Sequence, residues 1–425
     1  MREKFSQLKS VAFGKLKTPN TTDNYIVALD IGTDNVKAVI VKQVDSTLEV
    51  VGAGRAHQGL QDMQAGAISD IQAVVANCDE ALDIAEKSAG VTAKQVVVGI
   101  AGELIKGITN SVKVSRENPE KELDVKEVDE LARRVQSEAY RQAKEELSIE
   151  LSTSDIELKL INSAVVEINI DGHKVTNPLG FQGKIIELQM YTAYAPLVHI
   201  GAIERTAAQL DLELLAVAAE PFAVARSVIG NNPDASDNVI LIDVGGGTTD
   251  IAVLRDGGLE GTRMFGIGGR VFTKSIARDL GVDFIEAEKL KIGLSTGEVH
   301  QAQKQKVEAA IEKTANIWIQ GVSLALAEFD WLDYLPHTIL LCGGGSSLAV
   351  LRTKLTDKEW QKDLPFSKIV EPKFIQPEDI KDMRDKTGEI KDHTMITVMG
   401  LARVGADTRA STTSRKSKLS KLLEN

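Results

Sequence analysis

Two stretches of the sequence place aspartate, glycine and threonine in the same order between apolar runs. They read "IVALDIGTDNVKAVIV" at 26–41 and "VILIDVGGGTTDIAVL" at 239–254. Each has an apolar run, Asp, one aliphatic residue, Gly, a small polar turn and a second apolar run. Aligning Asp30 with Asp243 also aligns Gly32 with Gly245. The pattern predicts two strand–turn–strand units of the same kind.

Such a turn can bind phosphate. Glycine permits positive φ and has no side chain to keep a phosphate away from the backbone N–H groups. The hydroxyls of Thr33, Thr248 and Thr249 can add donors. Asp30 and Asp243 would repel a phosphate directly, so we expect them to hold Mg²⁺ through water. Two facing turns would clamp the β- and γ-phosphates of a nucleotide. An ordinary hairpin is the alternative for either turn alone, although the glycines of "DVGGGTTD" (Gly245, Gly246, Gly247) would weaken a hairpin that binds nothing.

Two further stretches offer groups to the same site. "LLCGGGSSL" follows an apolar run, and its glycines 343–345 would let the backbone approach a flat ligand, although any tight strand-to-helix turn has a similar sequence. "AAEPFAVA" places Glu220 before Pro221 at a predicted helix start. Glu220 could orient a water molecule. It could equally be a first-turn acid that the helix dipole favours.

The composition limits the class of protein. At 425 residues the chain is long enough for two or more domains. A formal charge of −11 argues against a nucleic-acid partner. Cys78 and Cys342 form neither a disulfide framework nor a metal motif, which fits a reducing cytoplasm. No apolar run approaches the ~20 residues of a membrane-spanning helix, and the first residues do not have the pattern of a secretory signal.

The elements that position the turns alternate between strands and helices, as in an α/β protein. Helices are predicted near 69–90 and 197–210, and from the second turn to about 333. Residues 94–194 are predicted to form a strand–helix–strand–strand unit inserted in this pattern. The predicted parts are a basic extension at 1–22, a first lobe at 23–93 and 195–236 closed by about 395–405, the insert at 94–194, a second lobe at 237–394, and a basic tail at 406–425.

The motifs resemble those of the actin-like ATPase superfamily. "LDIGT" and "LIDVGGGTTDI" look like its two phosphate motifs, and "LLCGGGSSL" looks like its adenosine motif. "EAEKLK" resembles the helix whose Glu288 and Lys291 would meet the nucleoside. The resemblance implies a two-lobed fold that binds ATP and Mg²⁺ in the cleft between its lobes. The nucleotide-binding set that we expect is Asp30, Gly32, Thr33, Asn35, Lys37, Asp243, Gly245, Gly246, Gly247, Thr248, Thr249, Glu288, Lys291, Gly343, Gly344, Gly345 and Ser346, with Glu220 as the water-orienting residue.

The insert indicates a branch of the superfamily. A strand–helix–strand–strand (SHS2-type) insert at this position is typical of the bacterial FtsA family. "VVGAGRAHQGLQDMQAGAISD", "AEKSAGVTAKQVVVGIAGELIKG" and "NPLGFQGKIIELQMYTAYAP" resemble FtsA segments, and the resemblance covers about residues 25–405. There are departures. FtsA usually has Thr-Lys where this chain has Asp34-Asn35, and the lysine comes later, at Lys37.

Other branches fit less of the sequence. "VKAV", "EPFAVAR" and "GLAR" are similar to PilM, the actin-like protein of type IV pilus machines, which is the alternative. The chain lacks the peptide-binding domain of seventy-kilodalton chaperones. It also lacks the catalytic Asp and the sugar-binding lobe of sugar kinases, which makes a sugar-kinase-type phosphotransferase a weaker alternative.

The FtsA resemblance implies a cytoplasmic protein, peripheral on the inner face of the cell membrane. It implies filaments of the chain itself, the C-terminal tail of the tubulin-like division protein as a partner, and contacts with other divisome proteins. It implies at most a weak Mg-dependent ATPase, so that nucleotide would set conformation and polymerisation more than drive chemistry.

Both ends of the acidic chain are basic. On a helical wheel, Phe5, Leu8, Ala12 and Leu16 share one face, which predicts an interfacial helix attracted to anionic lipid. At the other end, "TRASTTSRKS" is typical of a linker, and Leu419, Leu422 and Leu423 lie among lysines. A disordered basic tail is the alternative for each end, as is a capping helix on the body for the first.

Overall fold

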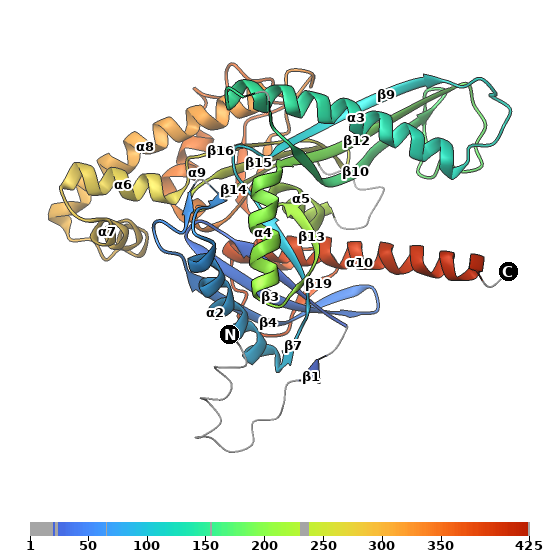
Figure 1. Ribbon diagram of the computed structural model, residues 1–425. Helices are drawn as coiled ribbons and strands as arrows, with labels where there is room; N and C mark the ends of the chain where they lie inside the picture. The colour runs from blue at the N-terminus through green and yellow to red at the C-terminus, as the bar shows by residue number, and fades with distance from the viewer. Residues whose placement is uncertain (1–19, 22–23, 65, 154, 230–237, 424–425) are drawn as a thin grey trace.

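The computed structural model describes residues 20–21, 24–64, 66–153, 155–229 and 238–423, with the backbone alone at residues 20, 21 and 229 and beyond residue 410. The described chain forms two lobes, each built on one twisted sheet, and an inserted unit that extends from the second lobe's sheet (Figure 1). None of the helices in these ranges is both long and apolar enough to cross a membrane.

The first lobe contains a six-stranded sheet in the order β13-β8-β2-β3-β4-β19. Its members are β2 (Tyr25–Ile31), β3 (Asn35–Val44), β4 (Thr47–His57), β8 (Gln95–Ile100), β13 (Glu213–Ala219) and β19 (Met383–Asp385). Helix α2 (Ile71–Ala89) packs on β3 and β4, and α4 (Leu197–Gln209) packs on α2 and β13. The sequence sets both ends of α2. The Asp70 carboxylate accepts hydrogen bonds from two first-turn N–H groups, and Gly90 ends the helix at φ 66°.

The second lobe occupies one half of a nine-stranded sheet, with strand order β16-β15-β14-β17-β18. Its strands are β14 (Val239–Val244), β15 (Thr249–Arg255), β16 (Gly258–Phe265), β17 (Thr338–Cys342) and β18 (Glu371–Phe374). Its helices are α6 (Gly269–Leu280), α7 (Phe284–Thr296), α8 (Gln301–Ala327) and α9 (Ala349–Thr356). Trp318 of α8 and Phe272 of α6 are fully buried in its core. This core fixes the face of the lobe that carries the second glycine turn.

The inserted unit continues the nine-stranded sheet in the order β11-β10-β12-β9. It consists of β9 (Lys106–Ser115), α3 (Val125–Glu150), β10 (Leu158–Ile170), β11 (His173–Lys174) and β12 (Ile185–Pro196). Strand β9 joins it to β16 of the second lobe, and α3 lies across its strands at the upper right of Figure 1. Leucine, valine and isoleucine side chains of α3, β10 and β12 form a separate small core.

Two helices pack between the lobes. Helix α5 (Glu220–Ile229) contacts β13 of the first sheet and β14, β15 and β16 of the second. Helix α10 (Ile396–Leu423) packs on α5 and on β2, β3, β8 and β13. Short elements complete the described chain: β1 (Asn20–Thr21), β5 (Met63–Gln64), β6 (Ala67–Ile68), β7 (Val91–Thr92), and the 3₁₀ turns η1 (Gly344–Ser347), η2 (Pro377–Asp379) and η3 (His393–Met395).

The inserted unit is also attached to α5. The Asn162 side chain of β10 accepts a hydrogen bond of 2.8 Å from the backbone N–H of Ala219, the residue before α5 begins. The ring of Tyr191, on β12, stacks on that of Phe222 with centroids 5.5 Å apart. The insert therefore supports the helix whose first residue is Glu220.

Three predicted boundaries differ from the structure. The strand at 95–100, predicted to open the insert at 94, is β8, which pairs in parallel with β2 and β13 in the first lobe. The strand that opens the insert is β9, whose alternating polar residues hid it. The second lobe does not continue to residue 394, because β19 already pairs with β4 of the first lobe.

The third difference lies at the C-terminal end. Helix α10 continues without a break to Leu423, so the linker predicted at "TRASTTSRKS" is helical. The apolar face predicted for residues 5–16 lies outside the described residues. So do the side chains of the three C-terminal leucines.

Candidate functional site

The first glycine turn is the hairpin between β2 and β3. Asp30 lies directly opposite Lys37 in this ladder, and their side chains form a buried ion pair of 2.8 Å. Gln58 supports the tip from below. Its backbone N–H donates to the Asp34 carbonyl over 2.9 Å, and its side chain donates to the Gly32 carbonyl over 3.3 Å. These two bonds hold the backbone carbonyls of the hairpin tip in place.

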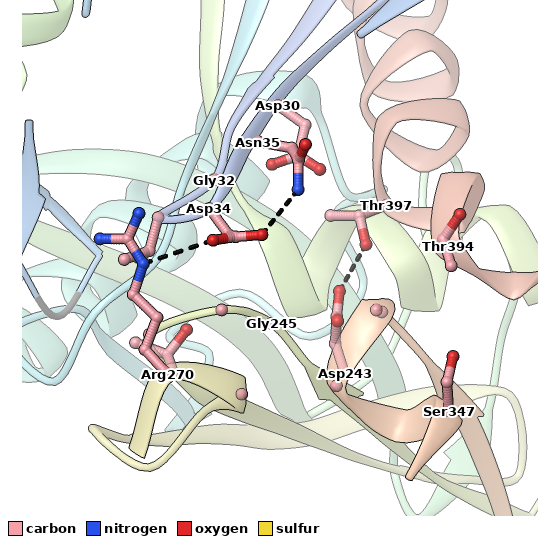
Figure 2. Close-up of a pocket in the computed structure, with 18 of the residues that line it drawn as sticks. Asp30, Gly32, Asp34, Asn35, Asp243, Gly245, Arg270, Ser347, Thr394 and Thr397 are labelled. Atoms are coloured by element: carbon pink, nitrogen blue, oxygen red, sulfur yellow. Dashed lines mark hydrogen bonds and ion pairs between the residues drawn. The ribbon is translucent and has the colours of Figure 1, made fainter. Parts of the chain in front are cut away.

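The second glycine turn is the hairpin between β14 and β15. Here Asp243 lies opposite Asp250, so a second carboxylate takes the position that Lys37 has in the first hairpin. Thr397 of α10 donates a hydrogen bond to Asp243 (Figure 2). Thr248 donates to one oxygen of Asp250 over 3.2 Å, while the other oxygen, Oδ1, is buried without a hydrogen-bond partner.

The two hairpin tips meet across the cleft. A Cβ on Gly247 would lie 2.4 Å from the Thr33 hydroxyl, and a Cβ on Gly246 would lie 2.7 Å from the Asp34 Cβ. Both distances are shorter than a real Cβ contact, so any larger residue would force the tips apart. Glycine is required here by the approach of the two lobes.

A cavity of about 350 Å³ lies between the lobes at these tips. Sixteen of the residues predicted from the sequence line it: Asp30, Gly32, Thr33, Asn35, Lys37, Glu220, Asp243, Gly245, Gly246, Gly247, Thr248, Glu288, Lys291, Gly343, Gly344 and Gly345. The three glycine clusters, far apart in sequence, therefore face one space.

Thr249, which was predicted to bind phosphate, does not line the cavity. The hydroxyl of Thr249 points into the second lobe, where it donates to the Ile267 carbonyl over 2.7 Å and accepts from the Trp318 indole over 2.9 Å. Its predicted contact with phosphate is wrong, because the alternation of a strand turns Thr249 away from the face that Thr248 shares with Asp250.

Ser346 is also misplaced by the sequence prediction. It is fully buried, and its hydroxyl donates to the Gly343 carbonyl over 2.7 Å, which closes the turn instead of facing the cavity. Its neighbour Ser347 lines the cavity in its place. Gly343 has φ 81°, and a Cβ there would lie 2.0 Å from the Asp243 carboxylate, so the third glycine cluster begins against the second hairpin.

The floor of the cavity carries more negative than positive charge. Burial raises the pKa of Glu220 well above its usual range, and the charges of Asp30, Asp250 and Asp243 raise it further. Burial and the charge of Asp243 do the same to the pKa of Asp250. Burial also raises the pKa of Asp243, although Thr397 and Lys37 oppose the shift. Four carboxyl groups thus share a buried space in which Lys37 pairs with Asp30.

Lys37 is charged in this site. Burial alone would lower its pKa, but the Asp30 and Asp243 carboxylates hold it above the ordinary lysine value. One ammonium group does not balance four carboxyl groups, and the buried Oδ1 of Asp250 has no hydrogen-bond partner among the described residues. The chemistry of this donor set would suit a divalent cation. Among the described residues, no three His, Cys, Asp or Glu side chains are grouped closely enough to hold a metal ion directly.

The far end of the cavity is lined by α7 and by the third glycine cluster. Glu288 and Lys291 form an ion pair of 2.8 Å one turn apart, and the Thr273 hydroxyl bonds to both. Ser347 and Thr394 also line the cavity (Figure 2). A carboxylate, an ammonium group and hydroxyls around a glycine-lined wall can bind a sugar edge and a flat base.

The sequence analysis missed several residues that line the cavity: Asp34, Arg55, Asp250, Gly269, Arg270, Ser295, Thr296, Ser347, Thr394 and Thr397. For Asp250 a signal was available, since the alignment of Asp30 with Asp243 also aligns Lys37 with Asp250. For Arg270 and Thr397 no signal was available, because they reach the cavity from α6 and α10 through the packing of the lobes.

The sequence of this chain is similar to that of known cell division proteins. Residues 240–400 match the model of the family described as cell division protein FtsA. Cell division protein FtsA of Bacillus subtilis is 28% identical over 288 residues, which are 66% of this chain and 60% of that protein. FtsA of Pseudomonas aeruginosa is 26% identical over 345 residues, which are 76% of this chain and 78% of that protein.

A solved structure supports the fold independently. The chain is similar, with a TM-score of 0.63 and 18% sequence identity, to a chain of the PilM–PilN type IV pilus biogenesis complex, over 89% of this chain and 98% of that one. The match supports the predicted α/β fold with two lobes. The chain is thus similar in sequence to cell division protein FtsA, and it has the actin-like ATPase fold.

Proposed function

We propose that the chain is an ATP-binding, actin-like scaffold that polymerises at the cytoplasmic membrane and tethers the tubulin-like ring during bacterial cell division. The proposal rests on the sequence similarity of this chain to FtsA proteins. The cleft, in which three glycine clusters line one cavity, agrees with it. The matched part spans 60% of the Bacillus subtilis protein, so the activity and partners of such proteins enter here as proposals.

In this proposal the two hairpins hold the β- and γ-phosphates between their tips, with N–H groups and the hydroxyls of Thr33 and Thr248 as donors. Asp30 and Asp243 hold Mg²⁺ through water, and Asp250 adds negative charge beside it. Bound Mg²⁺ would neutralise charge on the phosphates. Glu288 and Lys291 bind the ribose, and the wall at 343–347 receives the adenine.

Glu220 is the candidate for orienting an attacking water molecule. Burial and the charges of Asp30, Asp250 and Asp243 raise its pKa in the ligand-free site. A bound cation would lower that pKa and favour the carboxylate, the form that accepts a proton. The nucleotide is therefore expected to be hydrolysed slowly at most, and to act mainly by setting the conformation of the lobes.

Attachment to the membrane is proposed to use both basic ends. Each end supplies little apolar area, and ~1 kcal/mol for each basic residue near an anionic surface is of comparable size. Removing 1–17 or 409–425 singly should weaken flotation with anionic liposomes, and removing both should abolish it. We expect the loss of 1–17 to have the larger effect, because it contains Phe5, Phe13 and Leu16. Flotation of the doubly truncated protein would contradict this part.

Filament formation tests the proposal as a whole. The full chain with ATP and Mg²⁺ should form filaments on anionic lipid that electron microscopy can detect, and it should bind the C-terminal tail of the tubulin-like protein. No small-molecule phosphate acceptor is expected. ADP release that depends on a sugar would instead favour a kinase of the same fold.

The structure changes one experiment that the sequence suggested. Deleting 94–194 would remove β8 from the middle of the first sheet and Tyr191 from the main core. Substitutions on the exposed surface of the insert test its role without this damage. Leu179 and Phe181, which are 43% and 48% exposed between β11 and β12, are suitable positions. Their change to serine should weaken assembly while ATP binding persists.

A second function is favoured by the structural match. The chain covers 98% of the chain matched in the PilM–PilN complex, so a cytoplasmic component of type IV pilus assembly is the alternative. In that case the protein should neither float with lipid nor form filaments, and it should bind a segment of a membrane partner. The liposome and filament assays distinguish the two functions.

A further inference from the structure

Arg270 crosses from the second lobe to the first. It lies in the first turn of α6, and its side chain is 7% exposed. Its Nε pairs with the Asp34 carboxylate of the first hairpin over 3.4 Å (Figure 2). Its two terminal nitrogens donate to the backbone carbonyls of Gln58, Gly59 and Leu60, all in the first lobe, over 3.2–3.3 Å.

The backbone of the same residue is attached to the second hairpin. The N–H of Arg270 donates to the Gly246 carbonyl over 2.8 Å, and the N–H of Gly269 donates to the Gly245 carbonyl over 2.9 Å. Arg270 is thus bonded to the second phosphate hairpin by its backbone and to the first by its side chain.

Residues 58–60, whose carbonyls accept hydrogen bonds from Arg270, are also bonded to the first hairpin through Gln58. Gln58 is fully buried and bonds to the carbonyls of Gly32 and Asp34. Its own side-chain oxygen accepts from Asn77 of α2 over 2.6 Å. A continuous set of hydrogen bonds therefore runs from Gly246 through Arg270 and Gln58 to the tip of the first hairpin.

The donors of Arg270 indicate which role it has. A guanidinium group has five N–H donors, and four acceptors of the first lobe already engage all three of its nitrogens. Binding a phosphate would require breaking these contacts. Opening the cleft would also break all four contacts at once. Arg270 is therefore placed to hold the lobes together and not to contact the nucleotide.

We propose that Arg270 is a latch between the lobes, which sets the gap between the two phosphate hairpins and slows the release of nucleotide. The latch depends on Asp34, the position at which this chain departs from the Thr that is usual in the resembling family. The release rate rests on the proposed function, whereas the spacing of the lobes does not.

The spacing of the lobes can be measured without nucleotide. Spin labels on Glu80→Cys of α2 and Lys289→Cys of α7, both exposed positions on opposite sides of the cleft, report the distance between the lobes by pulsed electron resonance. Cys78 and Cys342 are buried and should not compete for the label. In the ligand-free full chain, Arg270→Ala should lengthen and broaden the distance distribution. Arg278→Ala is the control, since Arg278 is on the same helix, exposed, and paired with its neighbour Asp279.

The release rate tests the consequence. Chasing a fluorescent ATP analogue with excess ATP should show release at least about tenfold faster in Arg270→Ala, a change of about 1.4 kcal/mol. Arg270→Lys should not restore the slow rate, because one ammonium group cannot bond to acceptors in four directions. If Arg270→Ala fails to fold, Asp34→Asn should give a smaller change in the same direction.

The two measurements separate the possible failures. If the wild-type chain binds no ATP analogue, the proposed function fails, and the spin-label distances still test the latch. If Arg270→Ala, or Asp34→Asn where the first variant does not fold, keeps the wild-type distance distribution, the latch is wrong. An unchanged release rate despite wider lobes would overturn the link between the latch and nucleotide release.

Discussion

The two glycine hairpins have the same backbone pattern but differ in charge. In the first, Asp30 faces Lys37 across the ladder and forms a buried ion pair. In the second, Asp243 faces Asp250, and one oxygen of Asp250 has no partner. The acid of the first hairpin is therefore balanced by a lysine of the same hairpin, whereas the second hairpin pairs two carboxyl groups. Two hairpins of the same backbone pattern within one chain can therefore differ in the charge that they present to the cleft.

The largest expected effect comes from the second hairpin. Asp243→Ala should weaken the binding of ATP with Mg²⁺ by about 100-fold or more, because removing one essential partner of a bound ion costs several kcal/mol. The hairpin itself should persist, since its strands are buried in the sheet. Isothermal titration calorimetry gives the affinity, and unchanged ATP affinity in this variant would refute the phosphate clamp.

A pair of substitutions tests the difference in charge between the hairpins directly. Asp30→Asn leaves the buried Lys37 without its partner and should destabilise the ligand-free protein by about 3 kcal/mol. Asp250→Asn removes one of several like charges and keeps the acceptor for Thr248, so the melting temperature should rise. Thermal unfolding of both variants without Mg²⁺ measures the two shifts. Equal shifts of the melting temperature in the same direction would contradict the proposed difference in charge between the hairpins.

The pH dependence of stability sharpens this result. The pKa values of Asp250 and Glu220 are raised in the folded state above the ordinary 3.8 and 4.5. Below those values both carboxyl groups are protonated in the folded and the unfolded chain, so they do not lower the free energy of unfolding. As the pH rises above them, the unfolded chain loses protons first, so the folded state loses stability. Asp250→Asn should remove part of this loss, and its gain in melting temperature should therefore be larger at pH 7.5 than at pH 5. A gain that is constant with pH would count against the raised pKa.

The smallest expected effects concern the hydroxyl groups. Thr248→Ala and Ser347→Ala remove groups that line the cavity and should weaken ATP binding by about three- to tenfold, the loss of one hydrogen bond each. Their neighbours Thr249 and Ser346 face away from it, so Ser346→Ala should leave the affinity unchanged. Thr249→Ala should also leave the affinity unchanged, although it should lower stability because the Trp318 indole loses its acceptor. Weaker ATP binding by folded Ser346→Ala would restore the original sequence prediction.

The sequence predicted those parts of the fold that depend on a few adjacent residues. Apolar runs broken by Asp-x-Gly predicted both hairpins, and Asp70 and Gly90 marked the ends of α2. The predicted domain boundaries were wrong where strand pairing between segments far apart in the sequence decides to which lobe a strand belongs. Strand β8 is part of the first sheet because it pairs with β2 and β13, and β19 returns to β4 from the far end of the chain. Neither partner can be read from the local pattern.

The site divides in the same way. Glycines and carboxylates at the hairpin tips were predicted because their chemistry is visible in a few adjacent residues. Thr249 and Ser346 were assigned wrongly because the face on which a side chain lies depends on the exact turn. Arg270 and Thr397 were missed because only the packing of α6 and α10 brings them to the cleft.

The central claim is that the cleft binds ATP together with Mg²⁺, and titration of the full chain tests it most directly. ATP should be titrated calorimetrically into the protein at one pH, once with Mg²⁺ and once with a chelator. The four carboxyl groups should repel the triphosphate when no cation is present, so we predict saturable binding with Mg²⁺ and affinity lower by at least about tenfold without it. Equal affinity under both conditions, or no binding in either, would contradict the account.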